Sequence, residues 1–316
     1  MNGQHIIDAY ARIQHQIHTT PVMHSRLLNE RLGCEVILKC ENLQKVGAFK
    51  ARGAANAVLQ LTEAEASKGV ATHSSGNHGA ALAFAARERG IPCWVVMPAN
   101  APQVKKDAVA AYGAQIIECE PTLAARESTL EKTVQATGAQ FIPPYDDERI
   151  IAGQGTAALE LYQQLAEQGQ PLPEFILAPV GGGGLLAGTA LYSKSVAPGV
   201  TVIGTEPKGA DDCARGFNSK QRVTDAKPNT IADGLRTLVG EANFPIICDY
   251  VDEVLTVSEA AIVEAMTLVW TRTKLIIEPS SAVPIAAILE NPARFAGRRV
   301  AVILSGGNVE LGQLPF

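Results

Sequence analysis

The sequence lacks a paired cysteine motif, a surplus of positive charge and any apolar run of membrane-spanning length. Its six cysteines are scattered and form no C-x-x-C, so in a cytosolic α/β protein we expect reduced packing residues. The net charge of −5 gives no basic surface for nucleic acid. Residues 1–5 lack the basic and apolar regions of a signal peptide. We therefore expect a cytoplasmic protein that binds neither nucleic acid nor a membrane.

Strand and helix patterns alternate along most of the 316 residues. Short strands near 69–72, 93–97 and 114–118 are separated by helical stretches, and a second series of strands follows residue 147. Strands joined by crossover helices favour parallel sheets with helices on both faces. We expect an α/β fold with two domains, each an open, twisted, mostly parallel sheet. The weakly periodic stretch 209–248 is expected to be loop-rich.

Four consecutive glycines, Gly181–Gly184, stand between an apolar run at 175–178 and a helix-compatible stretch at 185–195. Glycine lets the backbone approach a ligand closely, and the N–H groups at a helix N-terminus favour an anion. The alternative is a flexible turn. No Lys-Ser/Thr follows as in a Walker loop. The spacing to Gly188 is wrong for a dinucleotide fingerprint, although an acidic residue, Glu206, lies at a suitable distance downstream. A dinucleotide-binding site is therefore disfavoured but not excluded. A small phosphate monoester fits better.

Lys50 follows Gly47-Ala48-Phe49 and opens an Ala-rich helix. A deprotonated lysine amine attacks carbonyls, and partial burial beside Phe49 promotes deprotonation. By itself the position is also typical of an exposed first-turn lysine. Together with a phosphate-binding loop, a reactive lysine indicates pyridoxal 5'-phosphate held covalently.

Two further polar segments end expected strands, at the sheet edge where ligands bind. In Ser74–Gly79, Asn77 is placed to donate to a phenolate oxygen and Ser75 to exchange a proton with a substrate carbon, although helix capping also explains these residues. His78 is also explained as a structural histidine. In Ser305–Asn308, Ser305 is placed to meet a ring nitrogen. The segment Glu278–Ala282 starts a helix that closes the pocket.

These motifs together resemble the serine racemase and serine/threonine dehydratase family, pyridoxal-phosphate enzymes of the tryptophan synthase β fold (fold type II). The resemblance covers nearly the whole chain, including the segments 151–156 and 230–234. It implies a large cofactor-binding domain of residues 1–68 and 147–316, a small mobile domain of residues 69–146, and a cofactor in the cleft between them. It also implies a homodimer.

The resemblance assigns roles residue by residue. Lys50 carries the cofactor, and Ser75 is the base on the opposite face of the substrate. The implied cofactor contacts are Phe49, Lys50, Asn77, Gly181, Gly182, Gly183, Gly184, Gly234 and Ser305. The implied substrate contacts are Ser74, Ser75, Asn77, His78 and Arg126.

The loop from Glu206 to Asp212 resembles the divalent metal loop of the same family. Its implied ligands are the Glu206 carboxylate, the Ala210 carbonyl and the Asp212 carboxylate, an all-oxygen set suited to Mg²⁺, Ca²⁺ or Mn²⁺. From the residues alone, an acidic solvated turn is the alternative. Val46 and Ala80 stand where mammalian serine racemase has nucleotide contacts, which argues against activation by ATP.

The implied reaction is β-elimination from serine, threonine or 3-hydroxyaspartate, giving a 2-oxo acid and ammonia. A 3-hydroxyaspartate dehydratase is one such member of the family. Racemisation of serine or of an aspartate-type substrate is a second activity, since Lys50 and Ser75 supply bases on both faces. The alternatives are an enzyme that is primarily a racemase, a β-replacement synthase of the same fold, and a cofactor-binding module without chemistry. A nicotinamide oxidoreductase is disfavoured by the glycine spacing.

Overall fold

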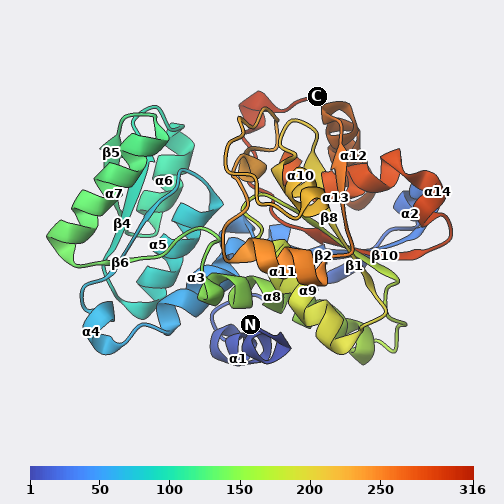
Figure 1. Cartoon of the computed structure of the whole chain (residues 1–316), viewed down its shortest axis with the longest axis horizontal. Coiled ribbons are helices and arrows are strands. Elements are labelled where there is room, and N and C mark those ends of the chain that lie inside the picture. The colour runs from blue at the N-terminus through green and yellow to red at the C-terminus, as the bar shows by residue number, and fades with distance from the viewer.

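Two separate β-sheets organise the chain in the computed structural model, which describes residues 1–316. Figure 1 shows the four-stranded sheet on the left and the six-stranded sheet on the right. The strand orders are β5-β4-β3-β6 and β1-β2-β10-β7-β8-β9. Every pairing is parallel except that of β1 with β2. The α/β class with two parallel-rich sheets is therefore confirmed.

The bounds of the elements follow. The strands are β1 (Val22–His24), β2 (Glu35–Cys40), β3 (Val70–His73), β4 (Cys93–Pro98), β5 (Gln115–Cys119), β6 (Gln140–Phe141), β7 (Phe175–Pro179), β8 (Thr201–Pro207), β9 (Glu253–Val257) and β10 (Arg299–Leu304). The helices are α1 (Gly3–Ile13), α2 (Arg26–Leu32), α3 (Lys50–Leu59), α4 (Glu63–Ala66), α5 (Asn77–Arg89), α6 (Gln103–Ala111), α7 (Leu123–Thr137), α8 (Glu148–Glu167), α9 (Gly184–Val196), α10 (Asp212–Ser219), α11 (Asn243–Tyr250), α12 (Glu259–Thr273), α13 (Pro279–Glu290) and α14 (Pro292–Phe295).

The central strands of the larger sheet are apolar along most of their length because helices cover both faces. In β2 and β10 every residue after the first is buried. The edge strand β9 is only partly covered, and most of its residues are half-buried. None of the helices is long and apolar enough to span a membrane, and all six cysteines are unpaired.

The parallel arrangement brings the chemical motifs to the carboxyl ends of strands. The glycine cup, as we call Gly181–Gly184, follows β7 after Val180. Ser305 follows β10 directly, and Ser74 follows β3 in the other sheet. Lys50 opens α3, which follows β2 after two short 3₁₀ turns. Ligands of open α/β sheets bind at these strand ends, so the topology gathers the motifs at facing edges.

The expectation of a loop-rich stretch at 209–248 is wrong in part. Two helices lie there, α10 and α11, each only eight residues long. Such short helices are unstable alone and depend on tertiary packing. α10 buries Cys213 and Ala214, and α11 packs against α9. The domain boundaries expected near residues 69 and 146 concern how the two parts move, and they stay a prediction.

A buried network of four charged side chains fixes the start of α3. Arg52, two residues after Lys50, is fully buried and donates to both carboxylate oxygens of Glu41 at 2.8 and 2.7 Å. It also donates to both carboxylate oxygens of Glu160, at 2.9 and 2.7 Å, and Lys39 donates to Glu160 at 2.8 Å. Burial works against the charged form of Glu41, yet Arg52 holds the pKa of that carboxyl below its usual value. The network ties together β2, α3 and α8 with two positive and two negative charges.

Candidate active site

Lys50 lies partly buried at the first position of α3. Its Nζ donates to the carbonyl oxygen of Pro144 at 2.6 Å and lies 5.0 Å from the centre of the Phe49 ring. Burial lowers the pKa of Lys50 to about 8, although the Glu278 carboxylate opposes the shift. The lowered pKa makes the neutral amine, which is the nucleophilic form, more abundant near neutral pH than it is for an ordinary lysine. These features are compatible with the reactive amine that the sequence suggests, and the role of Lys50 stays a prediction.

The segment around Lys50 is joined directly to the end of β10. The Phe49 N–H donates to the Ser305 carbonyl oxygen at 3.0 Å, and Ala48 forms an isolated bridge with Gly306. Ser305 is buried. The structure therefore brings Lys50, Phe49 and Ser305 together, although 255 positions separate Lys50 from Ser305 in the numbering.

Asn77 belongs to a closed ring of hydrogen bonds across three segments. Its Nδ2 lies 3.1 Å from both carboxylate oxygens of Glu278, and its Oδ1 accepts from Asn308 Nδ2 at 2.9 Å. The Asn308 N–H completes the ring by donating to Glu278 at 3.2 Å. Burial, and then Asp233, raise the pKa of Glu278 to about 7.

The sequence analysis places Glu278 in a segment that starts a helix and closes the pocket, and Asn308 in the polar segment after the last strand, but it predicts no contact between either residue and Asn77. Glu278 occupies the N-cap position of α13 before Pro279, but its side chain makes no capping bond and is buried instead. One sequence signal could have indicated that the Glu278 carboxylate is buried. It stands at a helix-cap position directly after apolar residues.

The other residues of the Ser74–Gly79 segment lie around Asn77. Ser75 is half-buried, and Ser74 Oγ accepts from the Gly76 N–H at 3.3 Å. His78 is buried and its Nε2 lies 3.0 Å from the Ile142 carbonyl oxygen, while its Nδ1 has no partner. Burial, and then the charge of Lys50, lower the pKa of His78 to about 3. His78 is therefore neutral near pH 7 and anchored to the backbone.

The glycine cup presents unused donors at the start of α9. The N–H groups of Gly181, Gly182 and Gly183 donate to no protein acceptor, and α9 has no side-chain cap. Gly183 has φ of +95°, a conformation that glycine adopts without strain. A Cβ at Gly182 would overlap the ring of Tyr145, so this position admits only glycine. Buried, unpaired N–H groups at a helix N-terminus fit a phosphate group.

Gly234 lies beside the same site. Its N–H donates to Ser280 Oγ at 3.0 Å, and a Cβ there would lie 2.9 Å from that oxygen and 3.8 Å from the Glu278 carboxylate. A larger residue at this position would have to displace the Ser280 hydroxyl and would lose the hydrogen bond to it.

A cavity of about 400 Å³ adjoins the site between the two parts of the molecule. Its lining includes Pro144, whose carbonyl accepts from Lys50, and Tyr145, whose ring packs on the glycine cup. Arg126 is half-buried on α7, beside His73, and its Nε has no partner. Arg126 has no hydrogen bond to Lys50 or Asn77, and its neighbours on α7, Leu123 and Glu127, line the cavity.

The residues of the expected metal loop are buried at and just after the carboxyl end of β8: Glu206 belongs to the strand, and Ala210 and Asp212 follow it. Glu206 accepts from the N–H groups of Cys213 and Ala214, at 3.2 and 2.9 Å, and Asp212 accepts from the Val239 N–H at 2.9 Å. Burial, and then Asp212, raise the pKa of Glu206, and burial raises that of Asp212. No cluster of three or more His, Cys, Asp or Glu side chains suited to a metal is present. Two buried carboxylates without a basic partner nevertheless fit a cation held partly by backbone carbonyls.

Comparisons with known proteins identify a family and named relatives. The family described as "Pyridoxal-phosphate dependent enzyme" matches residues 13–306. The chain is 49% identical to the β-hydroxyaspartate dehydratase of Paracoccus denitrificans over 311 residues, covering 98% of this chain and 97% of the relative. It is 49% identical to the serine racemase of Dictyostelium discoideum over 313 residues, covering 98% and 95%.

The fold is also similar to the folds of solved structures. The crystal structure of a threonine deaminase from T.th. superposes with a TM-score of 0.94 at 45% identity, with 98% of this chain and 99% of that chain covered. The family match, residues 13–306, includes all the strands of both sheets. The chain belongs to the family of pyridoxal-phosphate dependent enzymes.

Proposed function

We propose that the protein catalyses β-elimination from a hydroxy amino acid, giving a 2-oxo acid and ammonia, with racemisation as a second activity. The observation that carries the proposal is the partly buried Lys50, with a pKa lowered to about 8, beside Asn77's hydrogen-bond ring and Ser305. The glycine cup adds the unused donors for a phosphate. The protein would act as a homodimer in the cytoplasm, with the small domain of residues 69–146 moving against the large one.

The substrate class follows from chemistry that the relatives' names share. β-Hydroxyaspartate, serine and threonine all carry a hydroxyl group on the β-carbon. Loss of the α-proton and of the β-hydroxyl removes one water, and hydrolysis of the resulting enamine returns one water and releases ammonia. The net products are the 2-oxo acid and ammonia, so no oxidant or reductant is needed.

Each site residue of this chain has a proposed role in the reaction. The bound cofactor would supply an electron sink that acidifies the α-carbon. Lys50 would hold the cofactor and move the proton at the α-carbon on one face, and Ser75 would do so on the other. Asn77 and Ser305 would orient the ring, together with Phe49 and Gly234, and the glycine cup would hold the phosphate. Ser74, Asn77 and His78 are proposed to line the site of the substrate carboxylate, and Arg126 is proposed to close over the bound substrate.

A substrate screen tests the proposal. Purified holoenzyme is incubated with L- and D-serine, L- and D-threonine and the 3-hydroxyaspartates, and both 2-oxo acid and enantiomer formation are recorded. We expect 2-oxo acid from at least one of them. Racemisation without 2-oxo acid would favour a dedicated racemase. Consumption only when a second nucleophile is added would favour a β-replacement synthase, and no turnover at all would favour a binding module.

Ser75→Ala should separate the two activities. The change removes the proton donor on one face but leaves Lys50 to act on an L-substrate. We expect racemisation to fall about 10²–10⁴-fold, the usual contribution of one acid–base group, and elimination from L-serine to fall less than about tenfold. Chiral chromatography and a 2-oxo acid assay measure both. Ser67→Ala, at an exposed serine that bonds only the Ala64 carbonyl, is the control. Equal losses in both activities would show that Ser75 only shapes the site.

We also propose that Glu206, the Ala210 carbonyl and Asp212 bind one Mg²⁺, Ca²⁺ or Mn²⁺ ion that stabilises the fold without touching the substrate. The support is the pair of buried carboxylates with raised pKa values and no basic neighbour in hydrogen-bond contact. Asp212 is also bonded to Val239, whose side chain packs near Gly183 of the glycine cup. Loss of the ion should therefore loosen the loop from Glu206 to Asp212 and disturb the glycine cup.

Chelation should lower both the thermal midpoint and the activity, and added divalent ion should restore them. Binding to the native state alone contributes about 2.7 kcal/mol at a hundredfold excess over Kd. Asp212→Ala should behave like the chelated protein and lose the response to metal. Asp211→Ala is the matched control, because that carboxylate is half-exposed and pairs with Arg215. If the metal-free protein keeps its thermal midpoint and its full activity, the loop is only an acidic turn and the proposed metal site is wrong.

A further inference from the structure

A fully buried asparagine supports the glycine cup from behind. Asn243 is the first residue of α11, and its side-chain Nδ2 donates to the Gly182 carbonyl at 2.8 Å and to the Tyr145 carbonyl at 3.2 Å. Its Oδ1 has no partner. Two carbonyl oxygens require a donor, so they fix which way the Asn243 amide faces.

The Gly182 carbonyl is held at a second point as well, because the Gly240 N–H donates to it at 3.0 Å. No peptide bond in the chain is cis. In a trans peptide the carbonyl and the following N–H point in opposite directions. Anchoring the carbonyl of Gly182 therefore directs the N–H of Gly183 away from Asn243, and that N–H has no protein acceptor.

We propose that Asn243 is a positioning residue that sets the direction of the donors in the glycine cup before the cofactor phosphate binds. The inference rests on the proposed function, in which the cup holds that phosphate. Donors that are already oriented cost no reorganisation when the anion arrives. The same amide holds the Tyr145 carbonyl, next to the Pro144 carbonyl that accepts from Lys50. Asn243 thus joins the phosphate end of the site to the segment at its lysine end.

Two ligands that differ only in the phosphate test this role. Apoprotein of the wild type, Asn243→Asp and Asn243→Ala is titrated with pyridoxal 5'-phosphate and with pyridoxal, and binding is followed by absorbance. Aspartate has the same shape but turns an acceptor toward two carbonyl oxygens, and alanine only removes the donor. We expect the affinity for pyridoxal 5'-phosphate to fall about tenfold to a hundredfold, the value of one hydrogen bond to a charged group. The affinity for pyridoxal should change less than about twofold.

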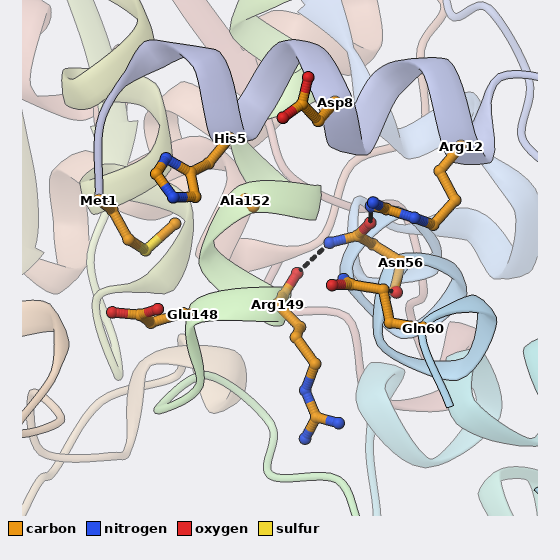
Figure 2. A pocket seen from close by; sticks show the side chains of 9 residues that line it. All are labelled: Met1, His5, Asp8, Arg12, Asn56, Gln60, Glu148, Arg149 and Ala152. Atoms are coloured by element: carbon orange, nitrogen blue, oxygen red, sulfur yellow. Dashed lines mark hydrogen bonds between the residues drawn. The ribbon is translucent and has the colours of Figure 1, made fainter. Parts of the chain in front are cut away.

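The control is a buried amide elsewhere. Asn56 is fully buried on α3, accepts from Arg12 at 2.6 Å and donates to the Arg149 carbonyl at 2.6 Å, as Figure 2 shows. Asn56→Ala should lower stability but keep the wild-type preference for the phosphorylated ligand. If Asn243→Asp does not fold, Asn243→Ser keeps one donor in a smaller side chain and should show a smaller loss of the same preference.

The outcomes separate the two proposals. A wild-type protein that binds pyridoxal as tightly as pyridoxal 5'-phosphate would overturn the phosphate site itself. A wild-type preference that survives intact in every folded Asn243 variant would overturn only the positioning role. Equal losses for both ligands would also overturn it, because general damage to the fold does not discriminate between them.

Discussion

Lys50→Ala is expected to abolish turnover and to remove the visible absorbance of the bound cofactor. The substitution deletes both the covalent attachment and the acid–base group, so we expect a loss of about 10⁴-fold or more. In the wild type, borohydride reduction followed by peptide mapping should place the adduct on Lys50. Because its pKa is lowered to about 8, the rate of cofactor capture should rise with pH through that value and level off above it.

Two other lysines serve as controls for this assignment. Lys45 lies 5.8 Å from the centre of the Phe84 ring, and Lys45→Ala should retain the cofactor and its absorbance. Lys39 is held in the buried network by Glu160 and is expected to stay unmodified. An adduct mapped to Lys39 or Lys45 would contradict the site.

Arg52→Ala is expected to destabilise the fold by about 3–5 kcal/mol, the usual result of removing one partner from a buried ion network. The change leaves Glu41 and Glu160 buried without their main counter-charge. Arg52→Lys should recover only part of the loss, since one ammonium group does not reproduce the paired bonds to two carboxylates. The midpoint of urea unfolding measures both.

Arg298→Ala is the matched control for Arg52. Arg298 pairs with Glu174 at 2.8 Å, but both side chains are about half exposed, at 55% and 45%. An exposed pair of this kind contributes less than about 1 kcal/mol. If Arg52→Ala unfolds at the same urea concentration as Arg298→Ala, the buried network adds nothing to stability.

The local sequence alone determined the elements whose signals lie within a few neighbouring residues. The apolar run before the glycine cup and the helix after it are visible in the chain, and the start of α9 falls at Gly184. The setting of Lys50 was equally local. α3 begins at Lys50, and the adjacent residue Phe49 covers the amine with its ring. The alternation of strands and helices along the chain then predicts parallel sheets, because neighbouring parallel strands need a crossover connection, usually a helix.

Tertiary structure decided how distant residues use their polar groups. Glu278, Asn308 and Asn77 form a ring across more than 200 positions, and no spacing within the chain predicts such contacts. Asn243 shows the same dependence: its helix is too short to be recognised from its own residues, and its amide matters only because Gly182 lies against it. A buried polar group must find a partner wherever packing provides one, so its role is set by the fold rather than by its neighbours in the sequence.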